Sequence, residues 1–236
     1  MLLAGRDLTV SFGGVHALVG VSIAVDAGEI VGLVGANGAG KTTLLDCLSG
    51  HVRPDYGQVM LDGRDLTRAA PDARARRGVV RSFQDARLFP AMSVRDALLV
   101  AQEGVAWSGL VGSLLSLPRW RAAEGRRMAA AASVAATTGL VAKLDTAVGD
   151  LSTGERRAVD LACVSLTAPR LLLLDEPSAG LASAEVPALS ELLARVRDAT
   201  GAGVIMVEHD WSLARGLADR IVVLEEGRVV RDSGSL

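Results

Sequence analysis

The stretch Ile30-Val31-Gly32-Leu33-Val34-Gly35-Ala36-Asn37-Gly38-Ala39-Gly40-Lys41-Thr42 joins a continuous apolar run to a glycine-rich loop. A short apolar run of this kind is typical of a buried parallel strand. The residues that follow, 42–49, have the pattern of a helix. A strand, a glycine loop and a helix in this order give a phosphate-binding motif its proper context. The stretch therefore predicts an α/β fold built around a parallel sheet.

The segment from Gly35 to Thr42 fits the G-x4-G-K-T phosphate loop at every position. Glycines let backbone N–H groups converge on phosphate oxygens, and the positive end of the following helix adds to the attraction. Lys41 is predicted to neutralise the β- and γ-phosphates, and Thr42 to hold Mg²⁺. The alternative is a glycine-rich turn without a ligand. The predicted ATP-binding residues of this segment are Gly35, Asn37, Gly38, Gly40, Lys41, Thr42 and Thr43.

A second apolar run, Leu171 to Asp175, has four leucines before its aspartate. The carboxylate of Asp175 is expected to emerge at the carboxyl edge of the sheet, near the loop that follows Val34. There it can hold Mg²⁺ through water, and the adjacent Glu176 can polarise an attacking water molecule. The alternative for this acidic pair is helix capping after a core strand.

The remaining pattern predicts short strands in the first part of the chain, a helical block in the middle and further strands at the end. Residues 1–84 and 169–236 are expected to form one core with a β subdomain, and residues 85–168 an inserted helical subdomain. The predicted strands are 7–11, 21–25, 30–34, 58–61, 79–82, 171–175, 204–207 and 221–225. The predicted helices are 42–49, 72–77, 94–102, 120–138 and 154–166.

Composition limits the classes of partner. At 236 residues, with 50% hydrophobic and 22% charged residues, the chain is expected to be globular. A formal net charge of −2 argues against a nucleic-acid partner. Cys47 and Cys163 lie in apolar segments and are expected to be buried, reduced thiols of a cytosolic protein. The apolar stretch 97–118 is broken by glycines, which favours a buried or docking helix over a membrane span. No secretory signal opens the chain.

The element Leu151-Ser152-Thr153-Gly154-Glu155 lies between the phosphate loop and the Asp175-Glu176 pair. With these motifs in this order, the chain resembles the ATPase subunits of ATP-binding cassette (ABC) transporters over nearly its full length. The resemblance implies a P-loop NTPase (RecA-like) core with an antiparallel β subdomain and an inserted helical subdomain. It also implies that the nucleotide is closed between two cassettes, one of which supplies Ser152 and Gly154 in trans.

The resemblance assigns roles to three further residues. Gln84 matches the family's Q-loop, which reaches Mg²⁺ and water and senses the membrane partner. His209 matches the switch histidine that contacts the γ-phosphate. Phe12 lies 29 residues before Lys41, where the family stacks an aromatic ring on adenine; core packing is the alternative for this ring.

Several segments resemble one branch of the family, the ATPases of branched-chain amino acid importers. They are Arg81 to Gln84, Leu88 to Val94, Asp175 to Leu181 and Glu208 to Trp211. The lipopolysaccharide-export ATPase is a relative that shares the motif at Ala73 to Gly78.

The resemblance implies a subunit that hydrolyses ATP with Mg²⁺, peripheral on the cytoplasmic face of a bacterial membrane. Its implied partners are an identical chain or a paralogous ATPase, permease subunits and, indirectly, a solute-binding protein. The alternatives are the ATPase of a lipid or lipopolysaccharide exporter and a cassette ATPase acting in DNA repair or translation. A nucleotide-binding module without turnover is a further alternative.

The sequence also departs from the family pattern. Thr153 and Glu155 replace residues of the usual LSGGQ, and Ala182 stands where many members carry aspartate. The chain stops short of the branch's C-terminal helix, so we expect a truncated subunit or the ATPase end of a permease fusion. The arginines form two clusters, expected to be solvated helix faces or contacts with a permease or lipid head groups. These are Arg74, Arg76 and Arg77, and Arg119, Arg121, Arg126 and Arg127.

Overall fold

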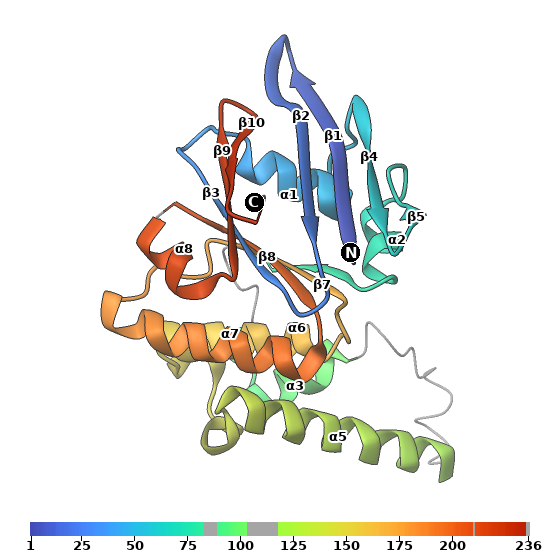
Figure 1. Cartoon of the computed structure of the whole chain (residues 1–236). Helices are drawn as coiled ribbons and strands as arrows, with labels where there is room; N and C mark the ends of the chain where they lie inside the picture. The colour runs from blue at the N-terminus through green and yellow to red at the C-terminus, as the bar shows by residue number, and fades with distance from the viewer. Residues whose placement is uncertain (83–88, 103–117, 210, 235–236) are drawn as a thin grey trace.

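Figure 1 shows the chain as a computed structural model that describes residues 1–82, 89–102, 118–209 and 211–234. Two sheets and a layer of helices are stacked on one another, with helix α1 (Lys41–Ser49) between the sheets. The predicted Q-loop residue Gln84 lies outside the described residues, as does most of the apolar stretch 97–118. Among the described residues, no helix combines the length and the apolar character that a membrane span requires.

The larger sheet has six strands in the order β10-β9-β3-β8-β7-β6. All neighbouring strands are parallel except β10, which runs antiparallel to β9. The strands are β3 (Ile30–Val34), β6 (Val79–Arg81), β7 (Leu171–Asp175), β8 (Gly203–Glu208), β9 (Arg220–Glu225) and β10 (Arg228–Asp232). The parallel α/β core expected from the sequence is therefore present, and β10 is an addition that the pattern did not reveal.

The smaller sheet is antiparallel, with four strands in the order β2-β1-β4-β5. Its strands are β1 (Leu3–Phe12), β2 (Val15–Val25), β4 (Tyr56–Leu61) and β5 (Arg64–Asp65). Strands β1 and β2 are longer than predicted because their pairing extends from Leu3 and Val25 to Phe12 and Val15, beside the tight turn that joins them.

The leucine run of β7 explains how the layers are held together. Leu171 and Leu173 join the apolar cluster that contains α1 and the antiparallel sheet, whereas Leu172 and Leu174 join the cluster of the helical layer. Successive strand residues point to opposite faces of a sheet, so a strand covered on both sides needs apolar residues at every position. All four leucines are accordingly at most 1% exposed.

The helical layer covers the other face of the larger sheet (Figure 1). Its helices are α3 (Val94–Ala101), α5 (Pro118–Thr138), α6 (Thr153–Ser165) and α7 (Val186–Thr200). Two shorter helices lie elsewhere: α2 (Pro71–Ala75) packs near α1, and α8 (Trp211–Leu217) lies beside β3. Helices α3, α5 and α6 agree with the predicted ones within two residues at each end. Helices α7 and α8 were not predicted.

Arg74 does not lie on a solvated helix face, contrary to the expectation for its cluster. Its side chain is 1% exposed, and its guanidinium donates hydrogen bonds to Cys47 O (2.6 Å), Leu48 O (2.8 Å) and Ala69 O (3.0 Å). The last carbonyls of a helix have no partner within the helix. Arg74 therefore binds the C-terminal end of α1 and holds α2 against it.

We expect Arg74→Met to lower the free energy of unfolding by about 2–4 kcal/mol, because buried helix-end carbonyls lose charged donors. The matched control is Arg76→Met, since Arg76 lies two residues further on, at the C-cap of α2, but its side chain is 71% exposed and pairs with Asp72. Urea denaturation followed by circular dichroism measures both variants. Equal losses of stability would contradict the structural role assigned to Arg74.

Candidate nucleotide-binding and hydrolysis site

The parallel register of three central strands brings the predicted site residues to one edge of the sheet. Val34 of β3 lies opposite Glu208 of β8, and Val207 of β8 lies opposite Asp175 of β7. The chain segments that leave these strands are the phosphate loop, the segment at His209 and the Asp175-Glu176 pair. Binding sites of open parallel sheets lie at such carboxyl edges.

Two glycines of the phosphate loop are required by close packing. A Cβ atom on Gly35 would lie 2.1 Å from the carbonyl oxygen of Leu224. Gly40 has a φ of 102°, and a Cβ atom there would lie 2.4 Å from the carbonyl oxygen of Ala17. Only glycine fits at a positive φ against neighbouring backbone. The loop is thus held between β9 and β2 in one conformation.

The side chain of Lys41 forms hydrogen bonds with the backbone of the phosphate loop. Its Nζ atom donates to Gly35 O at 2.6 Å and to Ala36 O at 2.9 Å, and the residue is 6% exposed. Helix α1 starts at Lys41, and no side chain of the described residues caps its N-terminus. The N–H groups of its first turn thus remain for an anion, and the exposed residues Asn37 and Gly38 form the open rim of the loop.

The oxygen donors at this edge suit Mg²⁺. Thr42 is exposed at the first turn of α1, Thr43 is half-buried beside it, and the carboxylate of Asp175 ends β7 with 8% of its side chain exposed. Mg²⁺ is usually held by one or two protein oxygens together with phosphates and water. In the part of the chain that the structure describes, no group of three acidic, histidine or cysteine side chains forms a metal cage. This donor set therefore fits a metal that arrives with nucleotide phosphates.

Glu176 and His209, both predicted to be catalytic, lie together in the structure. Glu176 Oε1 is 4.0 Å from His209 Nδ1, and His209 is exposed while Glu176 is 27% exposed. Glu176 has a φ of 47°, and both its backbone N–H group and its carbonyl oxygen form hydrogen bonds. Its N–H donates to Val207 O at 3.0 Å, and Arg157 of α6 donates to its carbonyl oxygen at 3.4 Å. A carboxylate beside an imidazole at the phosphate edge can accept a proton from water.

Glu208 is a residue of this site that the motif analysis did not single out. It is fully buried and accepts hydrogen bonds from the N–H (3.1 Å) and the hydroxyl (2.9 Å) of Ser178. Burial raises the pKa of Glu208, and the bonds from Ser178 oppose this shift. The pair fastens the loop after Glu176 to the end of β8, next to His209. The sequence shows both residues, but their pairing depends on strand order.

The element at Leu151 to Glu155 starts helix α6 in the helical layer. Ser152 is the N-cap: its hydroxyl accepts from Glu155 N–H (3.2 Å), and the carboxylate of Glu155 accepts from Ser152 N–H (2.9 Å). Lys143 pairs with Glu155 at 3.0 Å. The bond from Ser152 N–H, together with Lys143, lowers the pKa of Glu155. The glutamate that departs from LSGGQ is thus part of a capping box.

The structure does not bring every predicted site residue together. Within the described residues, Ser152 has its side-chain partner at Glu155, and Gly154 has Glu185 and Leu181 as its nearest non-local neighbours. Neither Ser152 nor Gly154 belongs to the cluster at the sheet edge.

Phe12 lies at the tip of the β1–β2 hairpin, opposite Val15. Its ring is 53% exposed and lies outside the apolar clusters, so core packing does not account for it. The same hairpin carries Ala17, whose carbonyl meets the phosphate loop at Gly40. The exposed ring is therefore on the strand pair that borders the loop.

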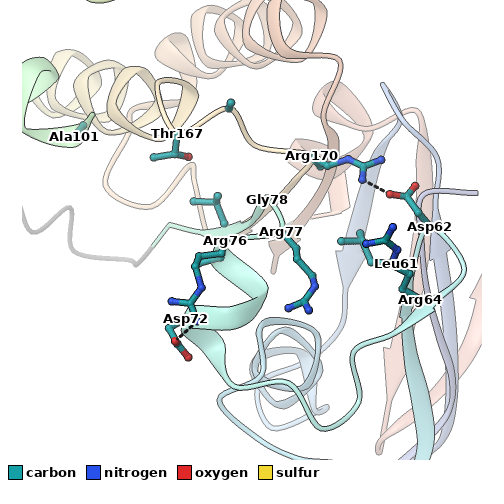
Figure 2. Close-up of a pocket in the computed structure, with 13 residues that line it drawn as sticks. Leu61, Asp62, Arg64, Asp72, Arg76, Arg77, Gly78, Ala101, Thr167 and Arg170 are labelled. Carbon is teal, nitrogen blue, oxygen red and sulfur yellow. Dashed lines mark hydrogen bonds and ion pairs between the residues drawn. The ribbon is translucent and has the colours of Figure 1, made fainter. Parts of the chain in front are cut away.

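A separate cleft of about 1010 Å³ lies between α2, the start of β6 and the end of β4 (Figure 2). Arg64, Arg76, Arg77 and Arg170 are among its lining residues, and two of these arginines are paired, Arg76 with Asp72 and Arg170 with Asp62. Arg77 donates to a carbonyl oxygen, that of Ala73. The lining thus combines basic groups with apolar residues that include Leu61 and Val80.

Comparison with known proteins places this geometry in a family. Residues 18–179 match the family described as ABC transporter. The branched-chain amino acid transport ATP-binding protein LivG of Salmonella typhimurium is 39% identical over 96% of this chain and 89% of its own length. Its counterpart BraF of Pseudomonas aeruginosa is 37% identical over 98% of this chain and 91% of its own.

Among solved structures, an ATP-binding cassette of an ABC transporter in its ADP conformation is similar to this fold. It has a TM-score of 0.80 and 26% identity, and the match covers 98% of this chain and 90% of that one. These matches confirm the fold class and the resemblance that the sequence motifs indicated. The chain belongs to the ABC transporter family and is one of its ATP-binding cassette ATPases.

Proposed function

We propose that this chain binds and hydrolyses ATP to power a bacterial importer of branched-chain amino acids or related small solutes. The observation that carries the proposal is the meeting of the phosphate loop, Asp175 and the Glu176–His209 pair at one sheet edge. The similarity to LivG and BraF supports the importer branch and the substrate class.

In this proposal the phosphate loop binds the triphosphate of ATP. The N–H groups in the first turn of α1, from Lys41 to Thr43, donate to phosphate oxygens, and Lys41 turns its ammonium from the loop carbonyls toward the β- and γ-phosphates. Phe12 stacks its exposed ring on adenine. Because the loop backbone is fixed against Leu224 and Ala17, little ordering is needed when the nucleotide binds.

Thr42, Asp175 and Gln84 are the proposed ligands of the metal site, Asp175 acting through water. When bound, Mg²⁺ would neutralise charge that develops on the phosphates. Glu176 orients and polarises the attacking water and accepts its proton, while His209 contacts the γ-phosphate. Their 4.0 Å separation allows both groups to face the same phosphate.

A single copy of the chain holds only part of the proposed site. Residues 85–168 form the proposed helical subdomain of one cassette domain, and Ser152 and Gly154 on it complete the site of a second cassette. ATP binding then closes the dimer, and hydrolysis reopens it. The second cassette is an identical chain or a paralogue, and the working assembly includes permease subunits and, indirectly, a solute-binding protein.

The cleft of Figure 2 is the proposed contact with the permease. It lies where β6 begins, and β6 leads to the segment of Gln84, so a permease seated there can influence the site. Such contact places the chain at the cytoplasmic face of the membrane as a peripheral subunit. The exposed guanidinium groups suit acidic side chains of that partner.

We expect Glu176→Gln to lower the rate of steady-state ATP hydrolysis at least about a hundredfold, because the amide cannot accept a proton. The same variant should accumulate as an ATP-bound dimer, visible by size-exclusion chromatography with light scattering. Glu191→Gln is the control, since Glu191 is 75% exposed on α7. Turnover like that of the wild type in Glu176→Gln would refute the proposed role of Glu176.

Ser152→Arg tests the contribution from the second cassette. The bulky cation at the α6 N-cap should block the approach of the facing phosphate loop, so ATP-dependent dimerisation is lost while each chain still binds ATP. Ser133→Arg, at an exposed position of α5, is the matched control. Light scattering with ATP in the Glu176→Gln background measures the effect. Dimerisation of the Ser152→Arg chain at the parent's ATP concentration would exclude a trans role.

A further inference from the structure

A buried charge cluster joins three elements behind the proposed metal site. Arg81, the last residue of β6, forms an ion pair with Asp175 of β7 (Nη2 to Oδ2, 3.0 Å) and another with Asp46 of α1. The side chains of Arg81 and Asp175 are 9% and 8% exposed, and that of Asp46 is 27% exposed. One guanidinium therefore forms ion pairs with two carboxylates at a position that is largely shielded from water.

The two pairs have opposite consequences for a cation at Asp175. Arg81 binds Oδ2 of Asp175 and offsets the negative charge of that carboxylate. Asp46 binds the same guanidinium and so weakens the effect of its positive charge on Asp175. Among the described residues, two carboxylates thus bind one guanidinium. In a site with little water, each of these charges acts strongly on its neighbours.

We infer that Arg81 is a positioning residue that fixes the carboxylate of Asp175 and, together with Asp46, sets its affinity for the catalytic metal ion. The fork of an arginine can bind two carboxylates at once in a fixed geometry, which a lysine cannot reproduce. Because α1 carries Asp46 one turn beyond Thr42, the cluster also keeps the metal-binding strand end aligned with the phosphate loop. This inference rests on the proposed role of Asp175.

The test measures metal affinity instead of turnover. Mn²⁺ replaces Mg²⁺, and its binding to the ATP-loaded Glu176→Gln protein is followed by loss of the free-ion electron paramagnetic resonance signal. We expect Asp46→Asn to weaken Mn²⁺ binding about three- to tenfold, because a nearby negative charge is lost. Arg81→Met should strengthen it by a similar factor, because Asp175 loses its competitor for the cation.

Controls separate charge from folding. Arg81→Lys keeps the charge and should bind Mn²⁺ within about twofold of the parent Glu176→Gln protein. Made in the chain that retains Glu176, the same substitution should lower kcat at unchanged KM for ATP. Asp198→Asn, an exposed position on α7, should change nothing. ATP affinity in EDTA reports that each variant is folded. If Arg81→Met does not fold, weaker Mn²⁺ binding in Asp46→Asn together with binding within about twofold of the parent in Arg81→Lys supports the inference, and weaker binding in both overturns it.

The opposite signs are diagnostic, because a merely structural role would weaken metal binding in both Asp46→Asn and Arg81→Met. Changes of the same sign, or no change in Asp46→Asn, would overturn the inference. If the parent protein with ATP takes up Mn²⁺ no more tightly than ATP alone, the proposed metal site is itself wrong, and the inference falls with it.

Discussion

The rest of the structure depends on the parallel pairing of β8 between β3 and β7. This register places Val34 beside Glu208 and Val207 beside Asp175, so three chain segments leave the sheet at one edge. Each of these strands has apolar residues on both faces, and the two faces pack into different apolar clusters. This packing fixes the register, because a shift by one residue would move each side chain into the other cluster. The chemistry at the edge is therefore a consequence of strand packing.

Two kinds of contact hold the edge in place once the strands are paired. Backbone contacts close the phosphate loop against Leu224 and Ala17, where side chains larger than hydrogen do not fit. Buried polar groups connect the strand ends: Ser178 with Glu208, and Arg81 with Asp175. Buried charges remain stable only when paired, so these groups restrict the edge to few arrangements. The element at Ser152 lies apart from this edge, at the start of α6 in the helical layer.

Sequence reasoning predicted the parts of the molecule that local pattern determines. The phosphate loop, the leucine strand β7 and the helices α3, α5 and α6 follow from periodicity and motifs. The pairing of Glu208 with Ser178 could not be predicted, because it depends on which strands are neighbours. Arg74 was wrongly placed in a solvated cluster, since its burial arises from contact with the distant end of α1. Helix α7 was missed, although it has the apolar spacing of a packed helix.

In the proposed dimer, each nucleotide is held by the phosphate loop of one chain and by Ser152 and Gly154 of another. Mixing two inactive variants, Lys41→Ala and Ser152→Arg, tests it most directly, because a mixed dimer has one intact composite site. We expect ATP hydrolysis to reappear in proportion to the mixed dimers formed, although each variant alone is inactive. Mixed dimers that form without regaining hydrolysis would contradict it.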